Sequence, residues 1–221
     1  MPEANPVREL FDTLLAAYGP RHWWPARTVP EMMIGALLVQ NTAWIGAERA
    51  VRQLEAAGLL DSWSRIRTSD DATLWTLLRP AGFFRVKTVR LREFARFMGN
   101  FADDHEVLFR LATPELRLKL LAVRGVGKET ADSILCYAAL RPVFVVDAYT
   151  RRIYHRLGWS DAQAGYDALQ SLTESRLPRD VAMLGEMHAL LVEHAKRHCR
   201  AKPLCTGCPV KFCACFSGSN G

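Results

Sequence analysis

The chain has 221 residues, of which 49% are hydrophobic and 24% charged. A chain of this length and composition can bury a substantial core and is typical of a soluble globular protein. No apolar run approaches the length of a membrane span, and the N-terminal segment lacks the apolar stretch of a secretory signal, so we expect a cytoplasmic protein with reduced thiols. The net charge of +6 favours a polyanionic partner.

Apolar residues recur at intervals of three and four along most of the chain, which predicts an all-α protein. The first predicted helix covers residues 7–18, and the second begins at Pro30. The glycine and proline breakers that follow delimit further helices near 44–57, 72–79, 86–101, 114–123, 129–140, 148–157, 162–175 and 179–198. One short segment, Val143–Val146, has the composition of a strand.

Basic residues crowd the helix predicted over 86–101 and the residue just before it. They are Arg85, Lys87, Arg90, Arg92 and Arg96. Such a cluster can contact phosphate groups, or it can be a solvated helix face. The sequence leaves both interpretations open.

The densest motif is a glycine hairpin between two predicted helices. Gly125-Val-Gly127 follows an apolar helix end, and a new helix begins with Lys128-Glu-Thr130. Two glycines one residue apart allow a tight turn, and the first amide groups of the following helix form an anion site. A DNA phosphate suits that site in a basic protein, although an ordinary turn between helices fits the same pattern.

The hairpin and the loop Arg141-Pro-Val-Phe-Val-Val-Asp147 after it resemble the endonuclease III superfamily of helix-hairpin-helix DNA glycosylases. The resemblance covers nearly the whole chain and implies two helical lobes. Residues 23–140 would form a six-helix barrel-type lobe that contains the helix-hairpin-helix at about 114–135. Residues 1–22 and 141–221 would form a discontinuous lobe that contains an iron–sulfur loop at 199–215.

Asp147 ends an apolar run and precedes a predicted helix, which is the position of an N-cap. The resemblance implies a second role, that of the catalytic carboxylate. An ionised carboxylate stabilises positive charge that develops on a sugar, or activates the attacking nucleophile. Arg151, in the helix after it, is a candidate DNA contact together with the hairpin residues Gly125, Gly127, Lys128 and Thr130.

Glu129 occupies the position at which bifunctional members of this superfamily carry a lysine that attacks the sugar. A carboxylate cannot form an imine. The neighbouring Lys128 points elsewhere, because one residue along a helix rotates a side chain by ~100°. The resemblance therefore implies a monofunctional glycosylase that uses water as its nucleophile and lacks AP lyase activity.

Trp23-Trp24-Pro and Gln40-Asn-Thr-x-Trp44 resemble segments of the 3-methyladenine glycosylase branch of the superfamily. There the corresponding aromatic residues line the pocket for the flipped base, and electron-rich rings attract a cationic alkylated purine. Gln40 matches the residue that fills the gap in the base stack. On their own, tryptophans such as these are more often part of a hydrophobic core.

Four cysteines near the C-terminus have the spacing C-x5-C-x2-C-x4-C: Cys199, Cys205, Cys208 and Cys213. Reduced thiols at this density indicate a metal site, either a [4Fe–4S] cluster or structural zinc. The resemblance favours the cluster, although the first and last gaps are each one residue shorter than is usual in the superfamily. Cys215 is an alternative fourth ligand.

Together these features predict a monofunctional DNA glycosylase of base excision repair that prefers alkylated purines such as 3-methyladenine. The partner implied is double-stranded DNA with a damaged base, bound by a monomer in the cytoplasm or nucleoid of a bacterium, with no membrane association. Two alternatives remain open. One is a uracil, mismatched-thymine or oxidised-pyrimidine glycosylase with weak AP lyase activity, and the other is a DNA-binding member with little catalytic activity.

Overall fold

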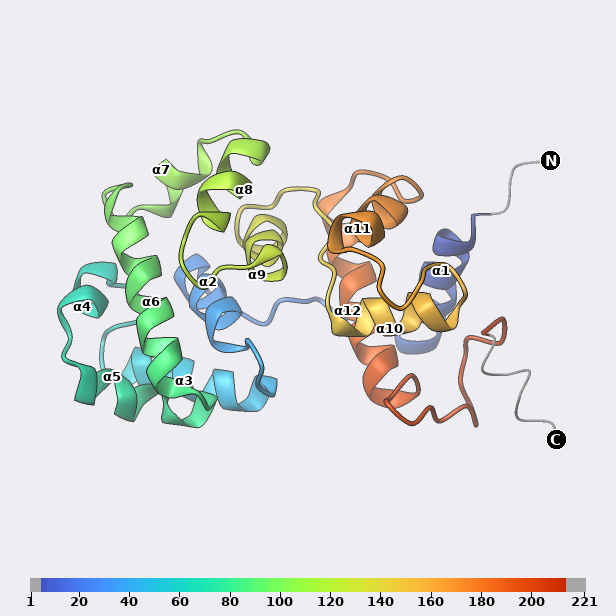
Figure 1. Ribbon diagram of the computed structural model, residues 1–221, viewed down its shortest axis with the longest axis horizontal. Coiled ribbons are helices and arrows are strands. Elements are labelled where there is room, and N and C mark those ends of the chain that lie inside the picture. Colours follow the sequence, from blue (N-terminus) through green and yellow to red (C-terminus); the bar gives the residue numbers. More distant parts are fainter. Residues whose placement is uncertain (1–4, 214–221) are drawn as a thin grey trace. The chain divides into compact units, whose positions relative to one another are not determined.

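A computed structural model describes residues 5–213, and every regular element within that range is a helix (Figure 1). The predicted all-α fold is confirmed. The chain divides into two compact units, one formed by Trp24–Ala139 and the other by Met1–Trp23 with Leu140–Gly221. None of the helices in the described part of the chain is long and apolar enough to span a membrane.

The unit Trp24–Ala139 is built around α2 (Val29–Leu38), whose residues 32–38 are all buried. This helix packs against α3, α6, α9 and the π-helical turn that continues α9, and it is apolar on all sides because every side faces protein. The other elements of the unit are α3 (Trp44–Ala56), α4 (Trp63–Thr68), α5 (Asp71–Leu78), a 3₁₀ turn (Arg79–Ala81), α6 (Phe84–Gly99), α7 (His105–Phe109), α8 (Thr113–Leu121), α9 (Lys128–Ser133) and the π-helical turn (Ile134–Ala138).

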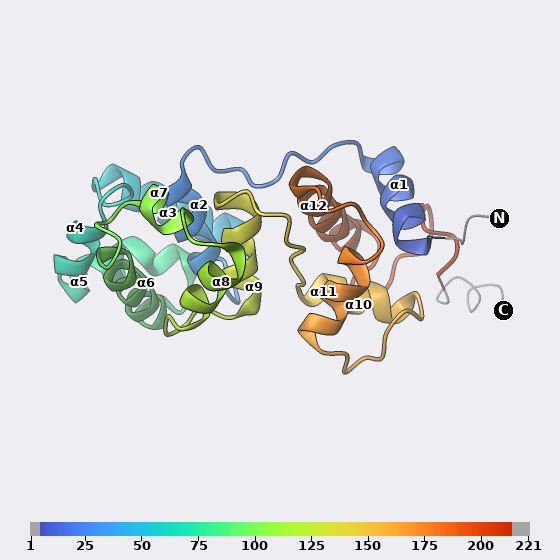
Figure 2. The same ribbon diagram turned by 90° about the horizontal axis from the view of Figure 1, so that it is seen from above.

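The other unit joins the two ends of the chain. Its helices are α1 (Pro6–Tyr18), α10 (Ala148–Arg156), α11 (Tyr166–Glu174) and α12 (Val181–Arg197). The first helix lies against the last, and α10 packs on α12 (Figures 1 and 2). One continuous apolar core underlies the unit and extends to Cys199 and Cys208. The cysteine loop is therefore attached directly to this core.

The segment Val143–Val146 is extended and buried, but it is not a strand. Side chains of α11 take the place of a neighbouring strand. The Phe144 amide donates to Glu174 Oε1 at 2.8 Å, its carbonyl accepts from Gln170 Nε2 at 2.7 Å, and the Val146 amide donates to the Tyr166 hydroxyl at 3.3 Å. Because buried backbone groups need partners, this pairing lets the segment run through the core to Asp147.

Candidate active site and cysteine loop

The hairpin between α8 and α9 requires glycine at only one of its two glycine positions. Gly125 has φ +92°, and a Cβ there would overlap the Arg90 side chain, with Cδ at 2.9 Å. Gly127 is the N-cap of α9, with an ordinary φ of −94° and open space around the position of a Cβ. Glycine at the N-cap places no side chain over the amide groups of the first turn.

Gly125→Ala is therefore expected to lower the free energy of unfolding by about 1–3 kcal/mol, because alanine is strained at this φ and Arg90 must move. Gly127→Ala is the matched control and is expected to change it by no more than about 1 kcal/mol. Urea denaturation followed by circular dichroism measures both. Equal losses in the two variants would contradict the assignment of the strained position to Gly125.

Gln40 is bound to this hairpin through both ends of its amide. Its Nε2 donates to the Gly125 carbonyl at 3.0 Å and to Thr130 Oγ1 at 2.8 Å, and its Oε1 accepts from Arg90. Lys128 lies exposed at the start of α9. The structure thus brings Gln40, Gly125 and Thr130 together, and it adds Arg90, which the sequence placed only in a basic cluster.

A partly buried ion pair ties the two helices of the hairpin to each other. Arg117 of α8 donates two hydrogen bonds, of 2.7 and 2.9 Å, to the carboxylate of Asp132 of α9, which is fully buried. Paired hydrogen bonds between a guanidinium and a carboxylate have a defined geometry. The pair therefore fixes the orientation of α9 relative to α8.

Trp24 and Trp44 meet in the unit Trp24–Ala139, whereas Trp23 belongs to the other unit. The two rings pack edge to face, with centroids 5.3 Å apart, and Tyr137 lies 5.6 Å from Trp24. Both tryptophans are half-buried. The ring of Trp23 instead faces Lys196 Nζ at 5.6 Å. The two adjacent tryptophans thus have different surroundings.

A strained and exposed phenylalanine, which the sequence reasoning missed, stands at the start of α6. Phe83 has φ +44° and is 69% exposed. The preceding Gly82 lies next to Thr42, in the loop that follows Gln40. Below the turn, the buried Lys87 donates from Nζ to the Ala81 carbonyl at 2.5 Å, and burial lowers the pKa of this lysine to about 8. A positive φ at a bulky residue marks a position held by its surroundings.

Asp147 is the N-cap of α10 and is almost fully buried. Its Oδ1 accepts from the Thr150 amide at 2.7 Å and from the Thr150 hydroxyl at 2.9 Å. Its Oδ2 lies 3.7 Å from Nε2 of His188 on α12. Burial by itself would raise the pKa of the carboxyl, but His188 and Thr150 outweigh it and hold that pKa below its ordinary value. The carboxylate is therefore ionised at neutral pH.

His188 is the second functional candidate that the sequence reasoning missed. It lies within an apolar stretch of α12, beside the buried Met187 and Ala189, and is itself buried. A single histidine in such a stretch looks like any core histidine. Only the packing of α12 against α10 brings it to Asp147.

Two other candidates have positions that the sequence did not specify. The guanidinium of Arg151 donates to the Ala164 carbonyl within its own unit. Glu129 is exposed in the first turn of α9.

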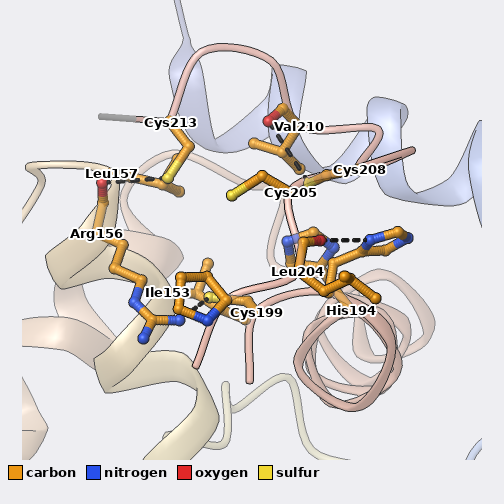
Figure 3. A pocket seen from close by; sticks show the side chains of 12 residues that line it. Ile153, Arg156, Leu157, His194, Cys199, Leu204, Cys205, Cys208, Val210 and Cys213 are labelled. Carbon is orange, nitrogen blue, oxygen red and sulfur yellow. Dashed lines mark hydrogen bonds between the residues drawn. The ribbon is translucent and has the colours of Figure 1, made fainter. Parts of the chain in front are cut away.

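The four described cysteines of the loop line one pocket (Figure 3). Cys199 and Cys208 are buried, and Cys205 and Cys213 are partly exposed. Apolar side chains such as Ile153, Leu157 and Val210 complete the wall. Cys136, Cys199, Cys205 and Cys208 are free thiols. Cys215 lies outside the described residues.

Two arginines of α10 hold this loop at the opposite end of the helix from Asp147. Arg156 donates to Cys199 Sγ at 3.2 Å and to the carbonyls of Arg200 and Ala201 at 2.6 and 2.9 Å. Arg152 donates to the Cys199 carbonyl at 2.7 Å. Cysteine sulfurs are the ligands of [4Fe–4S] clusters and of structural zinc, so four of them around one pocket suit such a centre. Within the described chain, no three His, Cys, Asp or Glu side chains are close enough together to hold a single ion.

Comparisons with known proteins agree with this architecture. Residues 34–179 match the family model described as "HhH-GPD superfamily base excision DNA repair protein". The protein named "Putative DNA repair glycosylase MJ1434" from Methanocaldococcus jannaschii is 44% identical over 210 residues, which is 94% of this chain and 95% of that protein. Endonuclease III of Thermotoga maritima is 27% identical over 182 residues, covering 81% of this chain and 79% of the relative.

Two solved structures extend the comparison. The H. pylori 3-methyladenine DNA glycosylase MagIII, bound to 1,N6-ethenoadenine, matches 87% of this chain and 96% of its own, with a TM-score of 0.74 and 27% identity. A trapped covalent complex of endonuclease III with DNA matches 98% of each chain, with a TM-score of 0.82 and 19% identity, which shows the shared fold. The chain belongs to the HhH-GPD superfamily of base excision DNA repair proteins, a superfamily of DNA glycosylases. The predicted resemblance is confirmed.

Proposed function

We propose that this protein is a monofunctional DNA glycosylase that binds duplex DNA as a monomer and hydrolyses the N-glycosidic bond of a damaged base, preferably an alkylated purine such as 3-methyladenine. The geometry of Asp147 carries the proposal. Oδ1 is engaged in capping α10, which anchors the carboxylate at the start of that helix, and its lowered pKa keeps it ionised. A fixed anion of this kind is what a positively charged sugar in a transition state requires.

In the proposed reaction, the bond between C1′ and the base nitrogen breaks, and its electron pair leaves with the base. Asp147 stabilises the positive charge that develops on the sugar. A water molecule then forms the new bond to C1′ and gives up a proton, leaving an abasic site. Because Glu129 supplies no amine, this scheme contains no imine and no strand cleavage.

The base must leave the duplex before Asp147 can act on its sugar. Phe83 is suited to fill the gap in the base stack, since its ring is exposed and its turn is held by Lys87. Apolar wedges of this type are used by proteins that unstack DNA. Gln40, predicted for this role from its sequence position, would first have to leave its bonds to the hairpin. The hairpin amides and Lys128 are the proposed phosphate contacts.

The preference for alkylated purines rests on the Trp24–Trp44 pair. Half-buried indole rings stack on a base and attract a cation through their π faces, and purines alkylated on a ring nitrogen carry such a charge. MagIII, a 3-methyladenine DNA glycosylase whose structure contains 1,N6-ethenoadenine, is similar to this chain over most of its length. A neutral pyrimidine lesion would gain only the stacking contribution.

A panel of duplexes tests the proposed function. Each duplex carries one of 3-methyladenine, uracil, mismatched thymine, thymine glycol or an abasic site, and strand breaks are scored before and after alkali. We expect breaks only after alkali, fastest with 3-methyladenine. Faster release of uracil or thymine would contradict the substrate preference, and breaks without alkali would contradict monofunctionality. Tight binding without release of any base would indicate a DNA-binding member of the family.

We also propose that Cys199, Cys205, Cys208 and either Cys213 or Cys215 hold a [4Fe–4S] cluster, with structural zinc as the alternative. When bound, such a centre would supply cross-links between the loop and the core of its unit. The contacts of Arg152 and Arg156 with the Cys199 segment would then stabilise α10 as well. No step of the reaction requires this centre.

Cys208→Ser is expected to abolish stoichiometric iron binding and to lower the unfolding temperature, because it removes a buried ligand of a structural centre. Iron and zinc analysis of anaerobically purified protein, with visible absorbance and thermal unfolding, measures this. Cys136→Ser, a buried thiol in the π-helical turn, is the control and should keep its iron. Stoichiometric zinc in the wild type would establish the alternative, and a wild type without metal would overturn both.

A further inference from the structure

The two oxygens of the Asp147 carboxylate have different surroundings. Oδ1 accepts both hydrogen bonds from Thr150, within the first turn of α10. Oδ2 takes no part in those bonds and lies 3.7 Å from Nε2 of His188 on α12. A helix cap uses one oxygen only, so the contact of the second oxygen needs a separate explanation.

The contact between Asp147 Oδ2 and His188 places two ionisable side chains in an apolar core. Both side chains are buried, and the helix residues beside His188, Met187 and Ala189, are apolar and buried. Burying an ionisable ring and a carboxylate is unfavourable unless the two interact. A separation of 3.7 Å between Oδ2 and Nε2 exceeds a hydrogen bond but is short enough for the imidazole ring to interact electrostatically with the carboxylate.

We propose that His188 is a positioning residue for the reaction, which fixes the orientation of Asp147 Oδ2 and keeps the carboxylate ionised inside an apolar core. This inference rests on the proposed function for the meaning of Asp147, but the pairing itself can be tested without any substrate. Thr150 alone would fix only one oxygen, and less would then oppose the tendency of burial to favour the neutral form of the carboxyl. With His188 present, α10 and α12 each hold one oxygen.

The lowered pKa of the Asp147 carboxyl agrees with this arrangement, since burial raises that pKa and His188 makes the largest opposing contribution. Among the described residues, His188 is the titratable side chain that contributes to it. Thr150 of α10 contributes by hydrogen bonding, and Tyr166 of α11 bonds the adjacent Val146 amide. Without His188, the effect of burial is opposed less strongly, so the pKa of the Asp147 carboxyl should rise.

The test uses His188→Leu, His188→Gln and, as a control for repacking of α12, Met187→Leu. Carboxyl ¹³C NMR follows the titration of Asp147 in the full-length protein, with its signal identified by its disappearance in Asp147→Asn. We expect the pKa to rise in His188→Leu, to rise less in His188→Gln, and to stay unchanged in Met187→Leu. If His188→Leu does not fold, His188→Gln decides the outcome, because it retains polar side-chain atoms without a titratable ring.

Single-turnover kinetics provide the second readout. We expect His188→Leu to slow base excision by about 10- to 100-fold, since a misplacement of a reacting group by about 1 Å can cost about 10²-fold, with an unchanged Kd for duplex DNA. The loss should be largest at the acidic end of the pH profile, and His188→Gln should recover part of it. An unchanged Asp147 pKa in a folded His188→Leu protein would overturn the proposal. A raised pKa in a chain that excises no base would instead uphold the pairing and reject the proposed function.

Discussion

Asp147→Asn is expected to slow base excision by at least about 10²- to 10³-fold, while the protein stays folded and binds duplex DNA as before. Losing one preorganised electrostatic group at a reacting centre typically has an effect of this size. Asparagine keeps a side-chain oxygen that can accept from the Thr150 amide, so the cap of α10 survives. The substitution thus removes the negative charge with little change in structure.

Asp180→Asn provides a matched control for this experiment. Asp180 is the N-cap of α12 in the same unit, and its Oδ1 accepts from the Met183 amide at 2.7 Å, the same distance as in the bond from Thr150 to Asp147. Both variants change a capping aspartate to asparagine, but only one changes the proposed catalytic charge. Single-turnover excision and fluorescence anisotropy of labelled duplex measure rate and affinity. Equal rates in the two variants would contradict the role of Asp147.

The pH dependence follows from the same carboxylate. Because its pKa lies below the ordinary value of an aspartate, about 3.9, the wild-type rate should not decline through loss of this charge between pH 7 and pH 5. The stability that the ionised carboxylate contributes should likewise persist over this range and be lost only as the pH falls through the lowered pKa.

The sequence predicted most of the long helices, because their apolar periodicity and breakers are local signals. It missed α4 and α7, which have six and five residues. Elements of one or two turns contain too few residues for a period to be recognised. The strand predicted at Val143–Val146 was wrong. The segment is extended and buried, but its backbone pairs with side chains of α11, at least 20 residues away, which no local pattern reveals.

The residues of the candidate site could be predicted only in part, because contacts between distant segments leave no local signal in the sequence. Asp147, Glu129 and the cysteines belong to motifs with fixed spacing, so a resemblance could identify them. His188 is 41 residues from Asp147 in the sequence and belongs to no recognised motif, so only tertiary packing brings it to the carboxylate. Phe83 had a local signal in Gly82, but a glycine before an aromatic residue does not reveal that the ring is exposed at a positive φ. Lys87 sits in a basic cluster, yet its side chain is buried.

Glu129→Lys is expected to convert the protein into one that forms a covalent complex with DNA. In the proposed scheme the amine nitrogen of the new lysine attacks C1′, the base leaves with the electron pair of the broken bond, and opening of the sugar ring gives an imine with loss of protons to solvent. Borohydride then adds hydride to the imine and makes the link permanent. The wild type, with a carboxylate at this exposed position of α9, should give no complex above background.

The experiment incubates each protein with a lesion-containing duplex and borohydride, and it scores the cross-linked band on a denaturing gel. Glu129→Arg is the matched control, because it makes the same change of charge next to the proposed phosphate site but supplies no amine nucleophile. We expect at least about a tenfold excess of cross-link in Glu129→Lys over Glu129→Arg if the imine forms at this position.

Lys128 shows whether any amine near position 129 is sufficient for trapping. It is adjacent to position 129 and exposed, so an amine is already present one residue away in the wild type. If proximity alone were sufficient, the wild type would be trapped as well, and that result would contradict the monofunctional proposal. If Glu129→Lys excises the base without being trapped, position 129 does not present its side chain to the sugar. Successive helical residues differ by ~100° in direction, so residues 128 and 129 cannot both point at the sugar. If Glu129→Lys is still trapped when Lys128 is also changed to alanine, the side chain of residue 129 is the one that reaches the sugar.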